Sequence, residues 1–294
     1  MKITLLGTGN PAPSLKRMGS GYLVSVGSDL IVFDHGPGSH HRLLETGTKA
    51  IDVTHAFFSH LHYDHFMDFP RLLLTRWDHA TAGTPELKVF GPPPIRNAID
   101  KLIGPQGVFG PDIEARMKWD ASLHVYRARG RREPRLPPAP EVHEIGDGDV
   151  VETKQWRVRA LEVPHAQPYL TCLAFRLDAG AGSIVYSGDT GPSTALEAFA
   201  KDCDILIHMC SHISGSVDDH ATRIGTSGHI EAARTAAAAG ARRLVMTHIY
   251  GQFDIPGVRE KVIAEMACVF DGTIVLGEDL MQLSPQPEQP GVFL

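Results

Sequence analysis

Three histidines and an aspartate occur within six residues, in the segment 60–65 (HLHYDH), directly after an apolar run typical of a buried strand. Alternate residues of an extended chain point to the same side, so His60 and His62 can bind one metal ion together. Asp64 and His65 follow where a helix is expected to begin, and their side chains can turn toward a second metal. Imidazole and carboxylate groups are ligands of zinc, manganese and iron. Isolated surface histidines are the alternative, but so dense a cluster favours a metal site.

Three further polar residues each end a predicted strand: His165, Asp189 and His248. Folds of alternating strands and helices often place their chemistry in loops at strand ends, because a rigid sheet holds those residues in register. One histidine at a strand end is usually only a polar cap. Together with the 60–65 segment, the three residues predict a single site.

The pattern H-x-H-x-D-H at 60–65 resembles the metallo-β-lactamase superfamily, and the chain looks most like its branch of ribonuclease Z and related phosphodiesterases. The resemblance spans about residues 2–283. Five other segments are similar to that branch: 6–13 (LGTGNPAP), 33–38 (FDHGPG), 163–165 (VPH), 186–190 (YSGDT) and 246–248 (MTH).

The resemblance implies a first metal bound by His60, His62 and His165, and a second bound by Asp64, His65 and His248, with Asp189 bridging the two. Two such metals hold a hydroxide between them and clamp the attacking and leaving oxygens, so hydrolysis is the expected chemistry. We expect two divalent ions, zinc first, with manganese or iron as alternatives.

Two residues are expected to act beside the metals. Asp64 can also orient the nucleophile. His229, in the segment 227–231 (SGHIE), is similar to the branch's histidine that is not a metal ligand, so we assign it the role of general acid. A histidine that merely begins a helix is the alternative.

Composition is that of an ordinary globular protein: 294 residues, 43% hydrophobic and 21% charged, with a net charge of −6. An acidic chain does not attract nucleic acid or anionic membranes as a whole, although a local patch can override the mean. Four cysteines without C-x-x-C spacing predict reduced, buried thiols. With no signal-peptide core and no apolar run long enough to cross a bilayer, a soluble cytoplasmic protein without membrane contact is expected.

Strands come first along the chain and strand–helix units follow, which predicts an α/β fold with helices outside two packed mixed sheets. This matches the αββα sandwich implied by the resemblance. We expect one domain over residues 1–283 and an extended tail over 284–294. The apolar end of the tail at 292–294 is a candidate docking segment, and a frayed terminus is the more frequent alternative. The segment 146–149 (GDGD) predicts a hairpin between the strands 142–145 and 150–153.

Residues 104–140, hereafter the insert, are rich in proline and glycine, which predicts a long irregular loop or lid. Four of its arginines are candidates for binding an anion, and a solvated loop is the alternative: Arg127, Arg129, Arg131 and Arg132.

Two departures from the branch bear on the substrate. Between His165 and Asp189, where the branch usually carries its tRNA-gripping arm, the chain has room only for two strands and a turn. After the strand at 204–208, where an acidic residue often follows, it has Met209-Cys210-Ser211. Together with the negative net charge, the missing arm predicts against tRNA as substrate.

We therefore expect a hydrolase of a small substrate, foremost a phosphodiester. A lactone or carboxylic ester hydrolase is the alternative within enzymes, because the same kind of site serves both. A di-iron redox or metal-sensing protein is the alternative of another class. Relatives in the branch are commonly dimers, which leaves a homodimer open.

Overall fold

The computed structural model describes residues 1–286. Residues 287–294 lie outside this range, and with them most of the predicted extended tail and its apolar end at 292–294. Within the described part, two sheets of seven strands each pack face to face.

The first sheet is built mainly from the N-terminal half of the chain. Its parallel part joins β3 through β6, whereas β14, β1, β2 and β3 pair antiparallel. In spatial order its strands are β14 (Gln282–Leu283), β1 (Lys2–Gly7), β2 (Gly21–Val26), β3 (Asp29–His35), β4 (His55–Phe57), β5 (Lys88–Gly91) and β6 (Glu141–Glu144).

The second sheet comes from the C-terminal half and is parallel from β10 through β13. In spatial order its strands are β13 (Thr273–Leu276), β12 (Arg243–Thr247), β11 (Ile205–Met209), β10 (Gly182–Tyr186), β9 (Leu173–Ala179), β8 (Trp156–Glu162) and β7 (Val150–Glu152).

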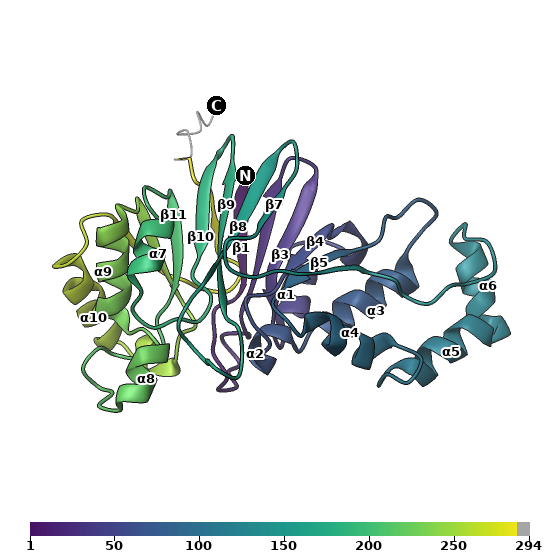
Figure 1. Cartoon of the computed structure of the whole chain (residues 1–294), viewed down its shortest axis with the longest axis horizontal. Helices are drawn as coiled ribbons and strands as arrows, with labels where there is room; N and C mark the ends of the chain where they lie inside the picture. The colour runs from purple at the N-terminus through teal and green to yellow at the C-terminus, as the bar shows by residue number, and fades with distance from the viewer. Residues whose placement is uncertain (287–294) are drawn as a thin grey trace.

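Helices lie on the outer faces of both sheets (Figure 1). Beside the first sheet are α1 (Ser39–Glu45), η1 (Ala50–Asp52), α2 (Tyr63–Phe66), α3 (Phe69–His79) and α4 (Ile95–Ile103). Beside the second are α7 (Thr194–Phe199), α8 (His220–Gly225), α9 (His229–Ala239), η2 (Gly251–Asp254) and α10 (Val258–Ala267). The predicted αββα sandwich is confirmed.

The four layers follow from the two-residue period of the strands, which sends successive side chains to opposite faces of a sheet. On β1, Leu5 packs between the two sheets while Leu6 packs under the helices. On β10, Ile184 faces the other sheet and Val185 faces the helices. Both faces of the central strands are therefore buried, as their apolar sequences require, whereas β6 and β7 are largely exposed.

The predicted hairpin between residues 142–145 and 150–153 is wrong, because its two strands belong to different sheets. β6 pairs with β5, and β7 pairs with β8. The turn at 146–149 is where the chain crosses from the first sheet to the second. Glycine and aspartate permit the turn itself, but long-range pairing decides which strands it joins.

About half of the insert is helical, and for that half the prediction of an irregular loop is wrong. It contains α5 (Gly110–Lys118) and α6 (Asp120–Ala128), which lie beyond α3 and α4 at one end of the molecule (Figure 1). Pro111 lies in the first turn of α5, where proline is compatible with a helix. Gly130 follows α6 with a positive φ. The prolines and glycines therefore begin and end helices here.

Arginines join the insert to α3 through one carboxylate, that of Asp78. Arg135, which is almost fully buried, lies 2.6 Å from Asp78 Oδ1 and over the ring of Trp77. Arg116 and Arg129 lie 3.2 Å and 3.7 Å from Asp78 Oδ2. These contacts hold the insert against the body of the protein.

Internal partners also engage two other candidate anion-binding arginines. Arg127 forms an ion pair with Glu133, and Arg131 donates to the carbonyl oxygen of Thr81. Anion binding by the arginines of the insert stays a prediction.

Three of the four cysteines are buried as predicted, whereas Cys268 is exposed at the end of α10. All four are free thiols, in agreement with the absence of a disulfide pattern.

Candidate metal centre

The predicted site residues follow strands that end at a common edge. β10 and β12 run parallel through β11, and β8 runs in the same direction because it is antiparallel to β9. His165, Asp189 and His248 lie just beyond β8, β10 and β12, and the 60–65 segment follows β4 of the facing sheet. Residues from both sheets therefore meet at one place.

Two glycines allow the loops of the site to approach one another closely. A Cβ at Gly36 would lie 1.8 Å from the carbonyl oxygen of Asp64. Gly188 has a φ of +58°, and a Cβ there would lie 2.5 Å from the carbonyl oxygen of Leu173. Any other residue would displace the loops that carry Asp64 and Asp189.

A first ligand group consists of His60, His62, His165 and Asp189. His62 Nδ1 lies 2.8 Å from His60 Nε2 and 3.3 Å from His165 Nε2. Asp189 Oδ2 lies 4.0 Å from His60 Nε2 and 3.6 Å from His165 Nε2. Two ligands on one tetrahedral zinc ion lie roughly 3.3 Å apart, given zinc–nitrogen distances near 2.0 Å. The spacing of the group fits one ion.

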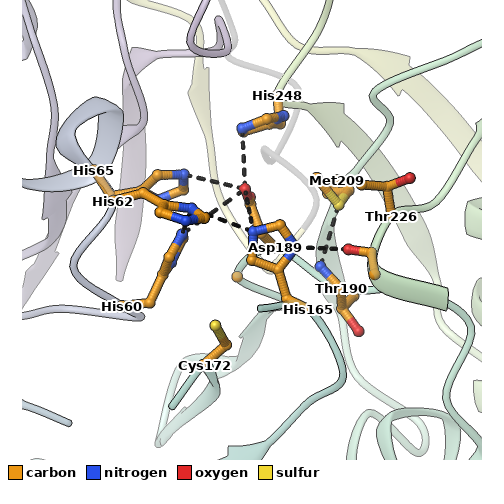
Figure 2. Close-up of polar contacts among 12 residues, drawn as sticks. His60, His62, His65, His165, Cys172, Asp189, Thr190, Met209, Thr226 and His248 are labelled. Carbon is orange, nitrogen blue, oxygen red and sulfur yellow. Dashed lines mark hydrogen bonds and ion pairs between the residues drawn. The ribbon is translucent and has the colours of Figure 1, made fainter. Parts of the chain in front are cut away.

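A second ligand group consists of Asp64, His65 and His248. Asp64 Oδ2 lies 3.4 Å from His65 Nε2 and 3.3 Å from His248 Nε2. The same Asp189 Oδ2 that borders the first group lies 3.4 Å and 3.1 Å from these two nitrogens. Figure 2 shows imidazoles of both groups around the Asp189 carboxylate. The structure thus brings all seven predicted ligands together in the predicted pairing.

The chemistry of these atoms fits divalent cations. His65 Nε2 is buried and has no hydrogen-bond partner among residues 1–286, although it points toward Asp64 and Asp189. Burying an unsatisfied polar atom costs free energy, so such an atom calls for a ligand. Nitrogen and oxygen donors without sulfur suit zinc, manganese or iron.

Electrostatics favour cation binding as well. Burial pushes the pKa of Asp189 upward, but His248 and His65 outweigh burial and hold that pKa well below its usual range. In turn, burial lowers the pKa of His248, but the carboxylates of Asp189 and Asp64 outweigh it and raise that pKa to about 9. Within the described part of the chain, these carboxylates have only imidazoles as ion-pair partners. Protons and metal ions therefore compete for the same nitrogens.

Asp34 fixes the orientation of His65 from behind. Its Oδ2 accepts hydrogen bonds from His65 Nδ1, Ser59 Oγ and Tyr186 Oη, each at 2.7 Å. Its Oδ1 accepts the Ser59 backbone N–H, also at 2.7 Å. The bond to Nδ1 leaves His65 Nε2 as the atom that faces Asp189. A carboxylate behind a ligating histidine both orients the ring and makes it a better ligand.

A cavity of about 610 Å³ opens over four of the predicted ligands, His62, His165, Asp189 and His248. Among residues 1–286, neither lysine nor arginine contributes to its wall. The wall outside the ligands consists of Pro11, Met209, Ser211, His212, Ser216, Val217, Thr222, Thr226, Tyr250, Gly251 and Gln252. No residue of the insert is among them, so the lid in this segment stays a prediction.

His229 is not brought to this cavity. It is buried at the start of α9, where Nδ1 accepts the backbone N–H of Ser214 at 3.0 Å. Its Nε2 lies 2.8 Å from Glu265 Oε2 on α10. Both nitrogens are thus engaged in contacts that join α9 to a loop and to a neighbouring helix.

His212 lies at the cavity although it is not among the site residues predicted from the sequence. It lines the cavity together with His62, His165 and His248, and Ser211 Oγ lies 3.1 Å from its Nδ1. Nε2 has no hydrogen-bond partner in the described part of the chain and can meet a ligand. Its signal was available in the sequence: His212 comes three residues after β11, at the same sheet edge as Asp189 and His248.

Comparison with known proteins agrees with the fold and the site. The family model described as "Beta-lactamase superfamily domain" matches residues 30–249. The ribonuclease Z of Mycobacterium marinum is 33% identical over 292 residues, which cover 95% of this chain and 97% of that protein. The chain therefore belongs to the β-lactamase superfamily, in its ribonuclease Z branch, and is a metal-dependent hydrolase.

Two solved structures have the same fold. The metallo-β-lactamase fold protein YhfI of Bacillus subtilis superposes with a TM-score of 0.72 at 21% identity, covering 96% of this chain and 99% of the other. The short form of human tRNase Z superposes with a TM-score of 0.70 at 22% identity, covering 98% and 100%.

The comparisons bear on the predicted substrate but not on the predicted homodimer. Relatives named ribonuclease Z keep an RNA substrate open, so the prediction against tRNA is not confirmed. The homodimer stays a prediction. No helix within residues 1–286 is long and apolar enough to span a membrane.

Proposed function

We propose that the chain hydrolyses a small phosphodiester with two divalent metal ions, zinc foremost, held by the two ligand groups. The observation that carries the proposal is the position of one atom, Asp189 Oδ2, which lies within 4.0 Å of ligand nitrogens from both groups. A carboxylate shared in this way keeps two cations close and partly neutralises them. When bound, two such ions polarise a phosphoryl oxygen and lower the pKa of water.

The chain's own residues would position and protonate the reacting groups. Asp64 is held as a carboxylate, because the hydrogen bond from His248 and the charges of His248 and His65 outweigh the effect of burial and lower its pKa. It can accept a hydrogen bond from the attacking water and orient it. His212 replaces His229 in our assignment as the residue that donates to the leaving-group oxygen, because its Nε2 is free and its ring lines the cavity.

The cavity wall favours a small substrate with little charge beyond the diester. The hydroxyl of Tyr250 and the side-chain amide of Gln252 can donate hydrogen bonds to one phosphate. The absence of lysine and arginine from the described wall gives no means of holding a long polyanion there. The same absence keeps a lactone or carboxylic ester as the second candidate, since an uncharged substrate needs no cation.

A test is turnover by the metal-stripped protein reloaded with zinc or manganese. Bis(p-nitrophenyl) phosphate, a small lactone and a precursor tRNA would be compared as substrates. We expect phosphodiester turnover that Asp189→Ala reduces to background and that a distant control, Asp178→Ala, leaves unchanged. Turnover of the lactone alone would transfer the assignment to ester hydrolysis. Efficient cleavage of the precursor tRNA would contradict the small-substrate proposal.

A further inference from the structure

Ser59, directly before the first histidine of the 60–65 segment, joins that histidine to Asp34. The serine is completely buried. Its Oγ lies 2.7 Å from Asp34 Oδ2 and 3.0 Å from His60 Nδ1. Its backbone is fixed as well, because the N–H donates to Asp34 Oδ1 at 2.7 Å and the carbonyl oxygen accepts the N–H of Leu173 at 2.9 Å. The hydroxyl is therefore held between a carboxylate and a predicted ligand of the first metal.

The available protons fix the direction of both hydrogen bonds of Ser59. A hydroxyl has one proton to donate, and its oxygen can also accept. The carboxylate of Asp34 only accepts, as its hydrogen bonds from His65 Nδ1 and Tyr186 Oη at 2.7 Å require. The proton of Ser59 Oγ therefore goes to Asp34, and the same Oγ accepts from His60 Nδ1. With its proton on Nδ1, the neutral ring of His60 keeps a free lone pair on Nε2 for a metal ion.

His165 of the same ligand group has a simpler arrangement. Its Nδ1 donates to the carbonyl oxygen of Gly225 at 2.6 Å, and a carbonyl oxygen can only accept. The proton of His165 is thereby placed on Nδ1 without a further partner. A hydroxyl beside His60 can act either way, so the proton of that ring is settled by the group that the hydroxyl itself contacts. In this site that group is Asp34.

We propose that Ser59 is a positioning residue for the first metal ion, because it links Asp34 to His60 and keeps Nε2 of that ring free. One buried carboxylate then orients a ligand in each group: His65 directly and His60 through the serine. This inference rests on the two-ion site of the proposed function and adds a residue on which the first ion depends. Loss of such a partner behind a ligating histidine lowers metal affinity about 10- to 100-fold.

The test measures the zinc affinity of each ligand group separately, by competition with a chelator. Asp64→Ala removes a ligand of the second group and leaves the first to be measured, and His62→Ala does the reverse. In the Asp64→Ala background, adding Ser59→Ala should lower the zinc affinity about 10- to 100-fold. In the His62→Ala background the same change should have little effect, because His65 keeps its own hydrogen bond to Asp34.

Ser20→Ala is the matched control. Ser20 is also completely buried, but its Oγ has no hydrogen-bond partner within residues 1–286, so both zinc affinities should stay unchanged. Ser59→Thr keeps the hydroxyl and should retain the affinity of the first group. A second measurement needs no variant: NMR correlation spectra of the histidine rings in the metal-free wild type should show His60 protonated at Nδ1. Ser59→Ala should remove this preference.

The outcomes separate this inference from the proposed function. An unchanged zinc affinity of the first group in Ser59→Ala would overturn the role of the serine, and so would a wild-type His60 protonated at Nε2. Equal losses in both backgrounds would also overturn it, because they would indicate a general loosening of the site. If the wild type binds zinc but cleaves no phosphodiester, the proposed function fails and the affinities still decide the role of Ser59. If Ser59→Ala does not fold, the wild-type spectra decide it.

Discussion

Replacing Asp34 by asparagine should weaken metal binding without unfolding the protein. Asp34 is completely buried and contacts the second ligand group only through His65 Nδ1. Its φ is +54°, a left-handed conformation that asparagine adopts nearly as readily as aspartate. The substitution therefore removes the charge and one acceptor while it keeps shape and backbone.

The hydrogen bonds of Asp34 set the size of the effect. The asparagine oxygen can take the place of Oδ2 and keep the bonds from His65, Ser59 Oγ and Tyr186. The amide nitrogen then faces the Ser59 N–H, and this unsatisfied donor pair should cost about 1–3 kcal/mol of unfolding free energy. Loss of the carboxylate behind a ligating histidine should lower metal affinity about 10- to 100-fold.

Metal affinity would be measured by competition with a chelator, and stability by urea unfolding. Asp279→Asn is the matched control, because Asp279 also accepts backbone and side-chain hydrogen bonds, from Thr8 and Met18, but none from a predicted ligand. We expect it to lose stability with unchanged metal affinity. An Asp34→Asn protein that binds metal within twofold of the wild type would refute the reasoning.

Three further predictions concern single side chains. His212→Gln should reduce kcat/KM about 100-fold or more for diesters with alkoxide leaving groups and far less for p-nitrophenyl esters. His229→Gln should change both values by less than about threefold, because both ring nitrogens of His229 are bonded to Ser214 and Glu265 and its ring does not line the cavity. Equal losses for both leaving groups in His212→Gln would contradict the donor role. Burial lowers the pKa of His208 from 6.5 to about 4. Between these pH values the unfolded chain binds a proton that the folded protein does not, so the free energy of unfolding falls as pH falls. Measured by urea unfolding, the free energy of unfolding of His208→Gln should fall by roughly 3 kcal/mol less over this range than that of the wild type. Asp78→Ala leaves the buried Arg135 unpaired and should lower the free energy of unfolding by about 3 kcal/mol, with kcat/KM unchanged. A thermal unfolding curve that matches the wild type would show that Asp78 does not anchor the insert.

The site was predictable to the extent that its residues follow strands. His60, His62, His165, Asp189 and His248 each come after an apolar segment that reads clearly as a strand, so their arrival at one sheet edge follows from the fold class. The structure adds what short motifs do not contain, namely that Asp189 Oδ2 lies between the two ligand groups.

His229 shows where local sequence fails. Its place at the start of an alanine-rich helix was predicted correctly, but the direction of its ring was not. That direction is set by two hydrogen bonds: the backbone N–H of Ser214 donates to Nδ1, and Nε2 donates to Glu265, which lies on the distant helix α10. No motif marks His212 in the sequence, because Met209-Cys210-Ser211 stands before it where an acidic residue often follows the strand in this branch.

The two wrong predictions about the fold, the hairpin and the irregular insert, also come from judging a segment without its distant partners. The turn at 146–149 is local, but the partners of β6 and β7 are Lys88–Gly91 and Trp156–Glu162, and pairing across the chain placed the two strands in different sheets. In the insert, the proline and glycine content predicts a loop, but Pro111 lies in the first turn of a helix and Gly130 follows one. The composition of a segment does not say which of these roles such residues have.

The central claim is that two divalent ions share Asp189, and the most direct test is the number of ions bound per chain. Native mass spectrometry of the zinc-loaded protein should give two ions for the wild type and at most one tightly bound ion for Asp189→Ala. Metal content by atomic emission after dialysis should agree. A wild-type protein that retains a single ion, or an Asp189→Ala protein that retains both, would contradict the account.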